Sequence, residues 1–230
     1  MSAAILIVVT SHAELGDSGV KTGLWLEELA VPWQVFVDAG LDVALASPLG
    51  GRPPIDPKSD REPGPEVRRF LDDPRALAAL EQTRRLSEVD LARFDAVFVA
   101  GGHGVMWDLA GTPEISDLLS DAWARERVVA AVCHGPAALV GARQPDGRPL
   151  VAGRRVAGFS DEEERAVGLA EIVPFLLESR LTELGGRYER GPNWAPFAVR
   201  DGRLVTGQNP ASSRAVAEEV LRALGEFRSR

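Results

Sequence analysis

Residues 128–139 read Val128-Val129-Ala130-Ala131-Val132-Cys133-His134-Gly135-Pro136-Ala137-Ala138-Leu139. The small and β-branched apolar residues up to Val132 predict a strand that is buried on both faces of a parallel sheet. The Gly135-Pro136 pair predicts the start of a helix. A strand that turns at once into a helix lifts one side chain above the sheet and aims backbone N–H groups at the same place. That side chain is Cys133, and the helix N-terminus is expected to give its thiol thiolate character.

Cys133 is the only cysteine among 230 residues. A buried, inert core cysteine is an equally good interpretation of this window alone, because cysteine is among the most buried residue types. A single cysteine also excludes an intramolecular disulfide framework, which fits a reducing cytoplasm. We therefore expect a cytoplasmic protein and look to the rest of the chain for a role for the thiol.

Composition narrows the classes of partner. The apolar start, Met1–Thr10, lacks the basic region of a signal peptide and predicts a first strand instead. No apolar run approaches the ~20 residues that span a bilayer, so no membrane partner is expected. The formal net charge is −8 and no basic stripe offsets it, which argues against a nucleic-acid partner.

Short apolar runs alternate with helical patterns along the chain. Strands are predicted over Ala4–Thr10, Val43–Ser47, Ala96–Ala100 and Val128–Cys133, and helices over Leu24–Ala39, Pro74–Thr83, Pro113–Arg125 and Pro210–Phe227. Repeated units of this kind predict an α/β fold in which helices cover both faces of a mostly parallel sheet. Residues 1–230 show no convincing linker or repeat, so we expect a single domain.

Two later segments predict shorter strands, and one earlier segment predicts a loop. Val151–Phe159 and Phe197–Val205 are expected to be strands, the second split into a hairpin at Asp201-Gly202. Gly50–Arg69 is rich in Pro, Gly, Asp and Arg and lacks periodicity. It is expected to form a long ordered loop or lid, with a mobile surface insertion as the alternative.

Ligands bind beyond the carboxyl ends of the strands in open parallel sheets. That rule selects four places, which are Thr10-Ser11-His12, Ser47-Pro48, Gly101-Gly102-His103-Gly104 and Cys133-His134. Glycines at 101–104 bring backbone N–H groups close to a ligand and predict an oxyanion hole built from Gly102 and the backbone at His134. The alternative is a tight turn that only needs glycine.

Acidic residues are expected to support the thiol. Glu28 shares a helix face with Leu24 and Val31, so its carboxyl group should either be hydrogen-bonded or keep its proton, and a raised pKa would suit it to a proton shuttle. The alternative is a helix glutamate in solvent. One member of the acidic run Asp161–Glu164 is expected to orient His134. A metal site is a weaker alternative, because only His12, His103 and His134 could cluster and their spacing matches no zinc signature. We predict no metal and no cofactor.

Several motifs together resemble the ThiJ/PfpI superfamily, also called class I glutamine amidotransferase-like, and within it the heat-shock chaperone-like branch that includes glyoxalase III. The matching stretches are Thr22–Pro32, Ala46–Gly51, Gly101–Gly104, Ala131–Pro136 and Leu204–Ser213. The resemblance implies a flavodoxin-like three-layer sandwich and a homodimer.

The resemblance also implies residue roles. Cys133 corresponds to the family's nucleophile, His134 to its partner, and Glu28 to the acid that hydrogen-bonds the thiolate. Glu164 matches the acidic third member, with Glu163 as the alternative register. Gly102, His103 and Trp194 are expected to contact the substrate. The implied reaction converts methylglyoxal, a small 2-oxoaldehyde, to lactate without glutathione.

Other functions stay open at this point. The chain is alternatively a holdase chaperone, a redox sensor that uses oxidation of Cys133, or a cysteine peptidase or amidase. A glutaminase is disfavoured, because that class places its His and Glu far downstream of the cysteine, and His134 is the only histidine after Cys133.

Overall fold

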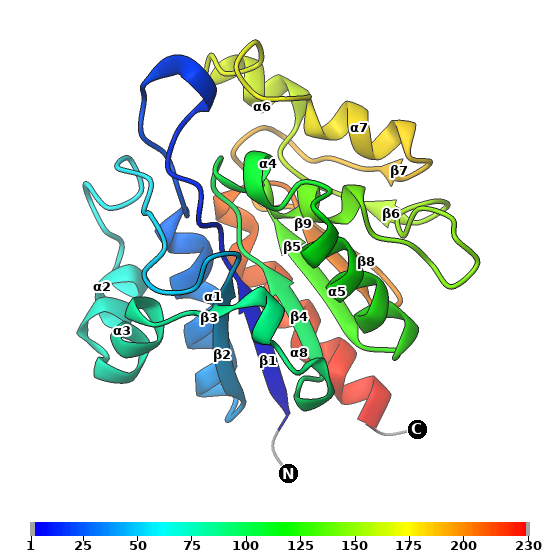
Figure 1. The fold of residues 1–230 in the computed structure, drawn as a ribbon, viewed down its shortest axis with the longest axis horizontal. Coiled ribbons are helices and arrows are strands. Elements are labelled where there is room, and N and C mark those ends of the chain that lie inside the picture. Colours follow the sequence, from blue (N-terminus) through cyan, green and yellow to red (C-terminus); the bar gives the residue numbers. More distant parts are fainter. Residues whose placement is uncertain (1–2, 229–230) are drawn as a thin grey trace.

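A seven-stranded mixed sheet forms the centre of the protein in a computed structural model that describes residues 3–228 (Figure 1). The strand order is β3-β2-β1-β4-β5-β9-β8, and all neighbours are parallel except the antiparallel pair β8–β9. A separate two-stranded sheet pairs β6 with β7. The strands are β1 Ala4–Val8, β2 Asp42–Ser47, β3 Arg84–Arg85, β4 Ala96–Val99, β5 Val128–Val132, β6 Arg155–Val156, β7 Arg187–Tyr188, β8 Ala198–Asp201 and β9 Leu204–Gly207.

Helices cover both faces of the sheet. Figure 1 shows α1 and α8 side by side behind the sheet and α5 in front of it. The helices are α1 Leu26–Asp38, α2 Pro65–Asp72, α3 Pro74–Glu81, α4 Val105–Asp108, α5 Pro113–Ala124, α6 Asp161–Ala166, α7 Leu177–Glu183 and α8 Ser213–Arg228. Short 3-10 turns are η1 Gly16–Ser18, η2 Leu86–Glu88, η3 Leu91–Arg93, η4 Gly135–Val140 and η5 Pro210–Ser212. This arrangement confirms the α/β three-layer sandwich.

The predicted strands and helices of the central sheet are confirmed within a few residues. Every residue of β4 and β5 is buried, as their continuous apolar runs require in a sheet covered on both faces. The hairpin is also present, because β8 ends at Asp201 and β9 begins at Leu204. Gly202 in its turn has a φ of 61°, a left-handed conformation that glycine adopts without strain.

Three predicted segments differ from the structure. The loop predicted over Gly50–Arg69 ends at Gly64, because Pro65 begins α2, which buries Val67 and Phe70. The strand predicted over Val151–Phe159 is reduced to Arg155–Val156, because turns around Gly153 occupy its first half. The helix predicted after Cys133-His134 is the six-residue 3-10 turn η4 rather than an α-helix.

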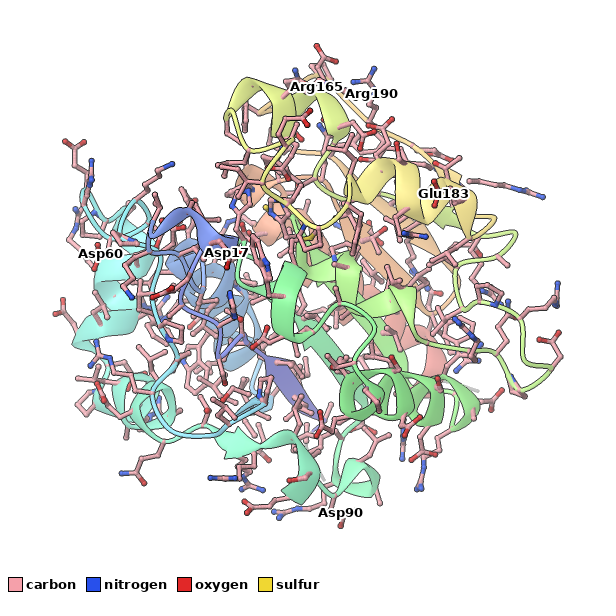
Figure 2. The ribbon with its side chains drawn as sticks, turned by 45° about the horizontal axis from the view of Figure 1, so that its top comes forward. Asp17, Asp60, Asp90, Arg165, Glu183 and Arg190 are labelled. Carbon is pink, nitrogen blue, oxygen red and sulfur yellow. The ribbon has the colours of Figure 1, made fainter. Side chains whose placement is uncertain are left out.

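The segment from α6 to β7 lies beyond the carboxyl ends of the central strands. Figure 1 shows α6 and α7 at the top, above the end of the sheet towards which β1, β4 and β5 run. In Figure 2 the charged residues Asp60 and Arg190 lie at the edge of the molecule, at the left and at the top. Within residues 3–228, no helix is both long enough and apolar enough to cross a bilayer.

Candidate active site

Cys133 follows β5 directly and adopts a left-handed backbone conformation, with a φ of 58°. A residue with a Cβ atom loses about 1–2 kcal/mol in this conformation. Two backbone hydrogen bonds hold it there: the Cys133 N–H donates to the Gly207 carbonyl at 3.0 Å, and its carbonyl accepts from the Phe159 N–H at 2.8 Å. Backbone groups of β9 and of the segment after β6 therefore fix the turn at Cys133-His134, which we call the elbow.

Glu28 reaches the elbow from α1. Its side chain is fully buried, and its Oε2 accepts a hydrogen bond from the Gly101 N–H at 2.9 Å. Only glycine fits at position 101, because an added Cβ would lie 2.4 Å from Oε2. Burial raises the pKa of Glu28 well above its ordinary value, although hydrogen bonds from Cys133 and from the Gly101 N–H pull it down. Glu28 therefore faces the sheet and is hydrogen-bonded, rather than lying in solvent.

The thiol does not have the acidity that the sequence predicted. Burial raises the pKa of Cys133 well above its ordinary value, the charge of Glu28 and the hydrogen bond to it raise it further, and the His134 backbone N–H lowers it. The prediction of a thiolate rested on a helix dipole, and the short turn η4 supplies little of one. A proton on Glu28 would remove the carboxylate charge, so the two groups titrate as a pair. Glu28 Oε1 is buried and makes no hydrogen bond of standard geometry among the described residues, which leaves it free to carry that proton.

His134 lies between the thiol and a carboxylate. Its Nδ1 is 3.4 Å from Cys133 Sγ, and its Nε2 is 2.7 Å from Glu164 Oε2. Burial and then the neighbouring His103 lower the pKa of His134. A neutral ring that donates its Nε2–H to Glu164 presents Nδ1 to the thiol as a proton acceptor.

Glu164 holds two imidazole rings at once. Its Oε1 is 2.8 Å from His103 Nε2, and the rings of His103 and His134 lie 4.0 Å apart between centroids. Burial raises the pKa of Glu164, but the charge of His134 and the hydrogen bonds of both histidines outweigh burial and lower it. Glu164 is therefore the ionised partner that fixes the orientation of His134.

The structure separates Glu163 from Glu164. Ser160 and Glu163 form a capping box, in which Glu163 Oε2 accepts from the Ser160 N–H and hydroxyl group, while Glu164 faces His134. The pattern Ser-x-x-Glu is a readable signal for a helix start, and it would have assigned the two neighbours from the sequence.

A cavity of about 300 Å³ opens beside Cys133. The three expected contact residues, Gly102, His103 and Trp194, all line it. The remaining lining residues are mostly apolar, and they are Leu15, Lys21, Trp25, Asp56, Lys58, His134, Phe159, Val167, Leu169 and Pro210. Phe159 stacks against His134 with 4.4 Å between ring centroids. No motif in the sequence marks Phe159 as a site residue, because its role depends on packing.

Two of the four places expected at the carboxyl edge do not line the cavity. His12 stacks on Trp107 with centroids 5.3 Å apart, and Thr10 donates a hydrogen bond to Asp108. Ser47 is buried against Thr83. Side-chain hydrogen bonds and packing at the ends of β1 and β2 therefore turn these residues away from the thiol.

The glycine turn exposes backbone donors to the cavity. Gly102 has a φ of 104°, and an added Cβ there would lie 2.2 Å from the Gly23 carbonyl oxygen. Among residues 3–228, neither the Gly102 nor the His103 amide donates to a carbonyl or side chain. Both residues line the cavity, whereas the backbone N–H of His134, the other donor predicted for an oxyanion hole, interacts with the Cys133 thiol.

One cluster offers the donor set of a metal site. Ligand atoms of His103, His134 and Glu164 lie within 4.8 Å of one another, a set of two imidazoles and one carboxylate. Each imidazole Nε2 already pairs with its own oxygen of Glu164, so the described residues satisfy the cluster without an ion. His12, which the metal alternative included, lies outside it.

The fold and the site define a class of proteins: parallel α/β sandwiches that carry a cysteine on a strained turn at the carboxyl edge of the sheet. The chain belongs to the DJ-1/PfpI family, whose model matches residues 20–223. This match confirms the resemblance seen in the sequence.

Individual relatives resemble the chain over nearly its whole length. It is 32% identical to the glutathione-independent glyoxalase HSP31 of Saccharomyces cerevisiae, covering 96% of this chain and 97% of that protein. The crystal structure of glyoxalase III from Candida albicans matches with a TM-score of 0.88 at 30% identity, covering 96% and 97% of the two chains. The Rapid Encystment Protein 24 KDa of Francisella tularensis matches with a TM-score of 0.93 at 36% identity, covering 96% and 99%.

Proposed function

We propose that the protein is a cofactor-independent glyoxalase that converts methylglyoxal and related 2-oxoaldehydes to 2-hydroxy acids without glutathione. The observation that carries the proposal is the position of the Cys133 thiol between the Glu28 carboxyl group and the His134 imidazole, beside a cavity. The names of the relatives from yeast and Candida albicans support the same reaction.

In this proposal Cys133 acts as the nucleophile. The thiol proton passes to His134 Nδ1, the sulfur forms a bond to the aldehyde carbon, and the imidazolium then gives its proton to the aldehyde oxygen to complete a hemithioacetal. Glu164 stabilises the imidazolium that results, as the third member of a nucleophile–base–acid set. The N–H groups of Gly102 and His103, which line the cavity, stabilise the oxygen that becomes negatively charged.

The next step moves hydrogen between carbons. The Glu28 carboxylate or the neutral His134 ring removes the proton from the former aldehyde carbon and returns one to the neighbouring ketone carbon, through an enediol. The first carbon is thereby oxidised to a thioester while the second is reduced to an alcohol. Water then hydrolyses the thioester, which frees lactate and the thiol. Because oxidation and reduction balance within the substrate, the reaction needs no external redox partner.

The proposal is tested by incubating purified protein with methylglyoxal in the absence of glutathione and assaying lactate. We expect lactate from the wild type and at least a thousandfold lower kcat/KM in Cys133→Ala. The control is Cys133→Ser, which retains a polar side chain of similar size at the elbow and should also be inactive. Equal rates for the wild type and Cys133→Ala would refute a cysteine mechanism.

The homodimer, the cytoplasmic location and the lid formed by residues 50–64 are further parts of the proposal. Asp56 and Lys58 of that segment line the cavity, which supports the lid.

A further inference from the structure

Trp194 forms the outer part of the cavity wall. It lies in a segment without helix or strand, residues 190–195, which we call the strap. The indole lies 5.8 Å from the Phe159 ring between centroids, and 48% of the residue is exposed. Its backbone is left-handed, with a φ of 64°, which a tryptophan adopts only when neighbouring groups hold it.

A buried carboxylate holds this backbone. Glu163 Oε1 accepts a hydrogen bond from the Trp194 N–H at 2.8 Å and another from Asn209 Nδ2 at 2.9 Å. Asn209 Nδ2 also donates to the Ala195 carbonyl at 3.0 Å. Glu163 and Asn209 are both fully buried, so neither bond competes with solvent. The strap is therefore fixed at Trp194 itself, by a residue of α6 and a residue that follows β9.

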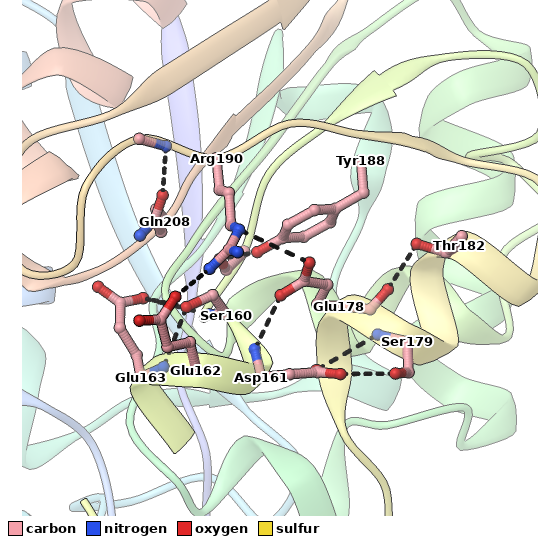
Figure 3. A network of polar contacts seen from close by, with 12 residues as sticks. Ser160, Asp161, Glu162, Glu163, Glu178, Ser179, Thr182, Tyr188, Arg190 and Gln208 are labelled. Atoms are coloured by element: carbon pink, nitrogen blue, oxygen red, sulfur yellow. Dashed lines mark hydrogen bonds and ion pairs between the residues drawn. The ribbon is translucent and has the colours of Figure 1, made fainter. Parts of the chain in front are cut away.

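Further contacts hold the start of the strap, as Figure 3 shows. Gln208 Oε1 accepts from the Gly191 N–H at 2.9 Å, and Arg190 pairs with Glu162 and Glu178. Glu162 differs from Glu163 in an important respect. It is exposed and binds side chains of the strap rather than its backbone. The two neighbouring glutamates thus provide a matched pair for an experiment.

The cavity is larger than methylglyoxal requires. Its volume of about 300 Å³ equals that of roughly ten water molecules at about 30 Å³ each. Methylglyoxal has only five non-hydrogen atoms. Leu15, Trp25, Phe159, Leu169 and Trp194 surround the space that remains, and an aromatic substituent would stack well among them.

We propose that Glu163 is a positioning residue that fixes Trp194 as the outer wall of the cavity, and that this wall selects 2-oxoaldehydes with an aromatic or bulky apolar substituent. This inference deepens the proposed glyoxalase function and rests on it for the identity of the reacting group. Glu163 itself does not touch the thiol or its partners in the described contacts. It acts through the backbone of Trp194.

The first test compares kcat/KM for phenylglyoxal with kcat/KM for methylglyoxal. We expect the wild type to favour phenylglyoxal, and Trp194→Ala to lower the ratio about tenfold through a higher KM for phenylglyoxal. Glu163→Gln should lower it in the same way, because an amide cannot accept all four hydrogen bonds that the carboxylate accepts. The control Glu162→Gln should change the ratio less than about twofold, because it loses only exposed contacts.

A second test does not depend on turnover. Cys133 is the only cysteine, so mass spectrometry follows its alkylation by iodoacetamide and by N-phenyliodoacetamide without interference. We expect the ratio of the phenyl reagent's rate to the small reagent's rate to fall about tenfold in Trp194→Ala and in Glu163→Gln, and to stay near the wild-type value in Glu162→Gln.

The outcomes separate the two proposals. If the wild type converts neither aldehyde, the glyoxalase proposal fails, and the alkylation ratio alone decides the role of the wall. If the wild type is active but both ratios are unchanged in Trp194→Ala, the selecting wall is refuted while the glyoxalase function stands. Equal effects of Glu162→Gln and Glu163→Gln would overturn the assignment to Glu163. Trp194→Ala alters an exposed residue and keeps the test open if Glu163→Gln does not fold.

Discussion

Cys133 and Trp194 both have a left-handed backbone conformation and line the same cavity, but different interactions hold them in place. Cys133 is 4% exposed, and backbone groups of Gly207 and Phe159 fix it within the sheet. Trp194 is 48% exposed, and the side chain of Glu163 fixes it from a neighbouring helix. The reacting end of the cavity is thus set by strand topology, whereas its outer wall is set by one buried carboxylate.

This difference means that the two ends respond to different mutations. The backbone that holds Cys133 can be displaced only by substitutions that disturb packing around the sheet, and these should also lower the free energy of unfolding. Trp194, in contrast, is held by the side chain of Glu163, so a single substitution such as Glu163→Gln can loosen it. Chemistry and substrate selection are therefore separable in this molecule.

The largest effect is expected from Gly101→Ala, which disturbs packing at the turn that carries Cys133. The new Cβ would lie 2.4 Å from Glu28 Oε2 and 2.7 Å from the Val132 carbonyl oxygen. We expect the free energy of unfolding to fall by about 3 kcal/mol, because a fully packed site must move apart. Urea unfolding measures this change. The control is Gly225→Ala in α8, where a Cβ meets nothing within 4 Å and should raise helix stability slightly. A Gly101→Ala protein as stable as the wild type would show that the elbow is not tightly packed.

The next largest effect is expected from Glu28→Gln, which alters proton transfer at the Cys133 thiol and leaves Trp194 in place. We expect kcat/KM for methylglyoxal to fall about a hundredfold, because an amide cannot shuttle a proton. The control is Glu27→Gln, the neighbouring and less buried carboxylate, which should have little effect. The rate of iodoacetamide alkylation at Cys133 should also change its pH dependence in Glu28→Gln. Identical alkylation profiles for both proteins would remove Glu28 from the proton pair.

A smaller effect is expected from Glu163→Gln on overall stability. The substitution leaves buried donors without an acceptor, so the free energy of unfolding should fall by about 2 kcal/mol. This is less than the loss expected for Gly101→Ala, because the wall lies at the surface and can relax. Urea unfolding of both variants under one condition gives the comparison. If Glu163→Gln lowered the free energy of unfolding more than Gly101→Ala, the Trp194 wall and not the Cys133 elbow would contribute more to stability.

The smallest effect concerns pH. The pKa values of His134 and Glu164 are lowered in the folded protein, so the unfolded chain takes up protons first as the pH falls. The free energy of unfolding should therefore fall as the pH drops below 6.5, and fall further below 4.5. The raised pKa of Glu28 acts in the opposite direction, because its contribution is lost as the pH rises above 4.5. Thermal unfolding of the wild type and Glu28→Gln should show the variant gaining stability relative to the wild type as the pH rises. A pH-independent difference between them would contradict the raised pKa.

Much of the elbow was predictable from the sequence. The apolar run before Cys133 predicted β5, and the glycine turn at 101–104 predicted the neighbouring edge that reaches the thiol. A short, continuous apolar run such as 128–132 is typical of a strand that is buried on both faces of a parallel sheet. The acidity of Cys133 was predicted wrongly, because a sequence shows a helix start but not the burial that opposes it.

The wall was far less predictable. Trp194 was expected to contact the substrate, but nothing in its own segment indicates why its backbone stays in place. The answer lies in Glu163 and Asn209, which are 31 and 15 residues away in the chain and meet it only in the folded molecule. His12 shows the converse error, because a polar residue at a strand end was expected in the site and packs on Trp107 instead.

The sequence by itself determined the α/β class and the place of the thiol at the edge of the sheet, because hydrophobic periodicity and local turn chemistry are encoded by neighbouring residues. The family followed from the resemblance of several short motifs. Only the tertiary structure decided which glutamate faces His134, how burial shifts the pKa values of the thiol and its partners, and what holds Trp194. Those properties depend on contacts and dielectric surroundings that residues distant in the chain create together.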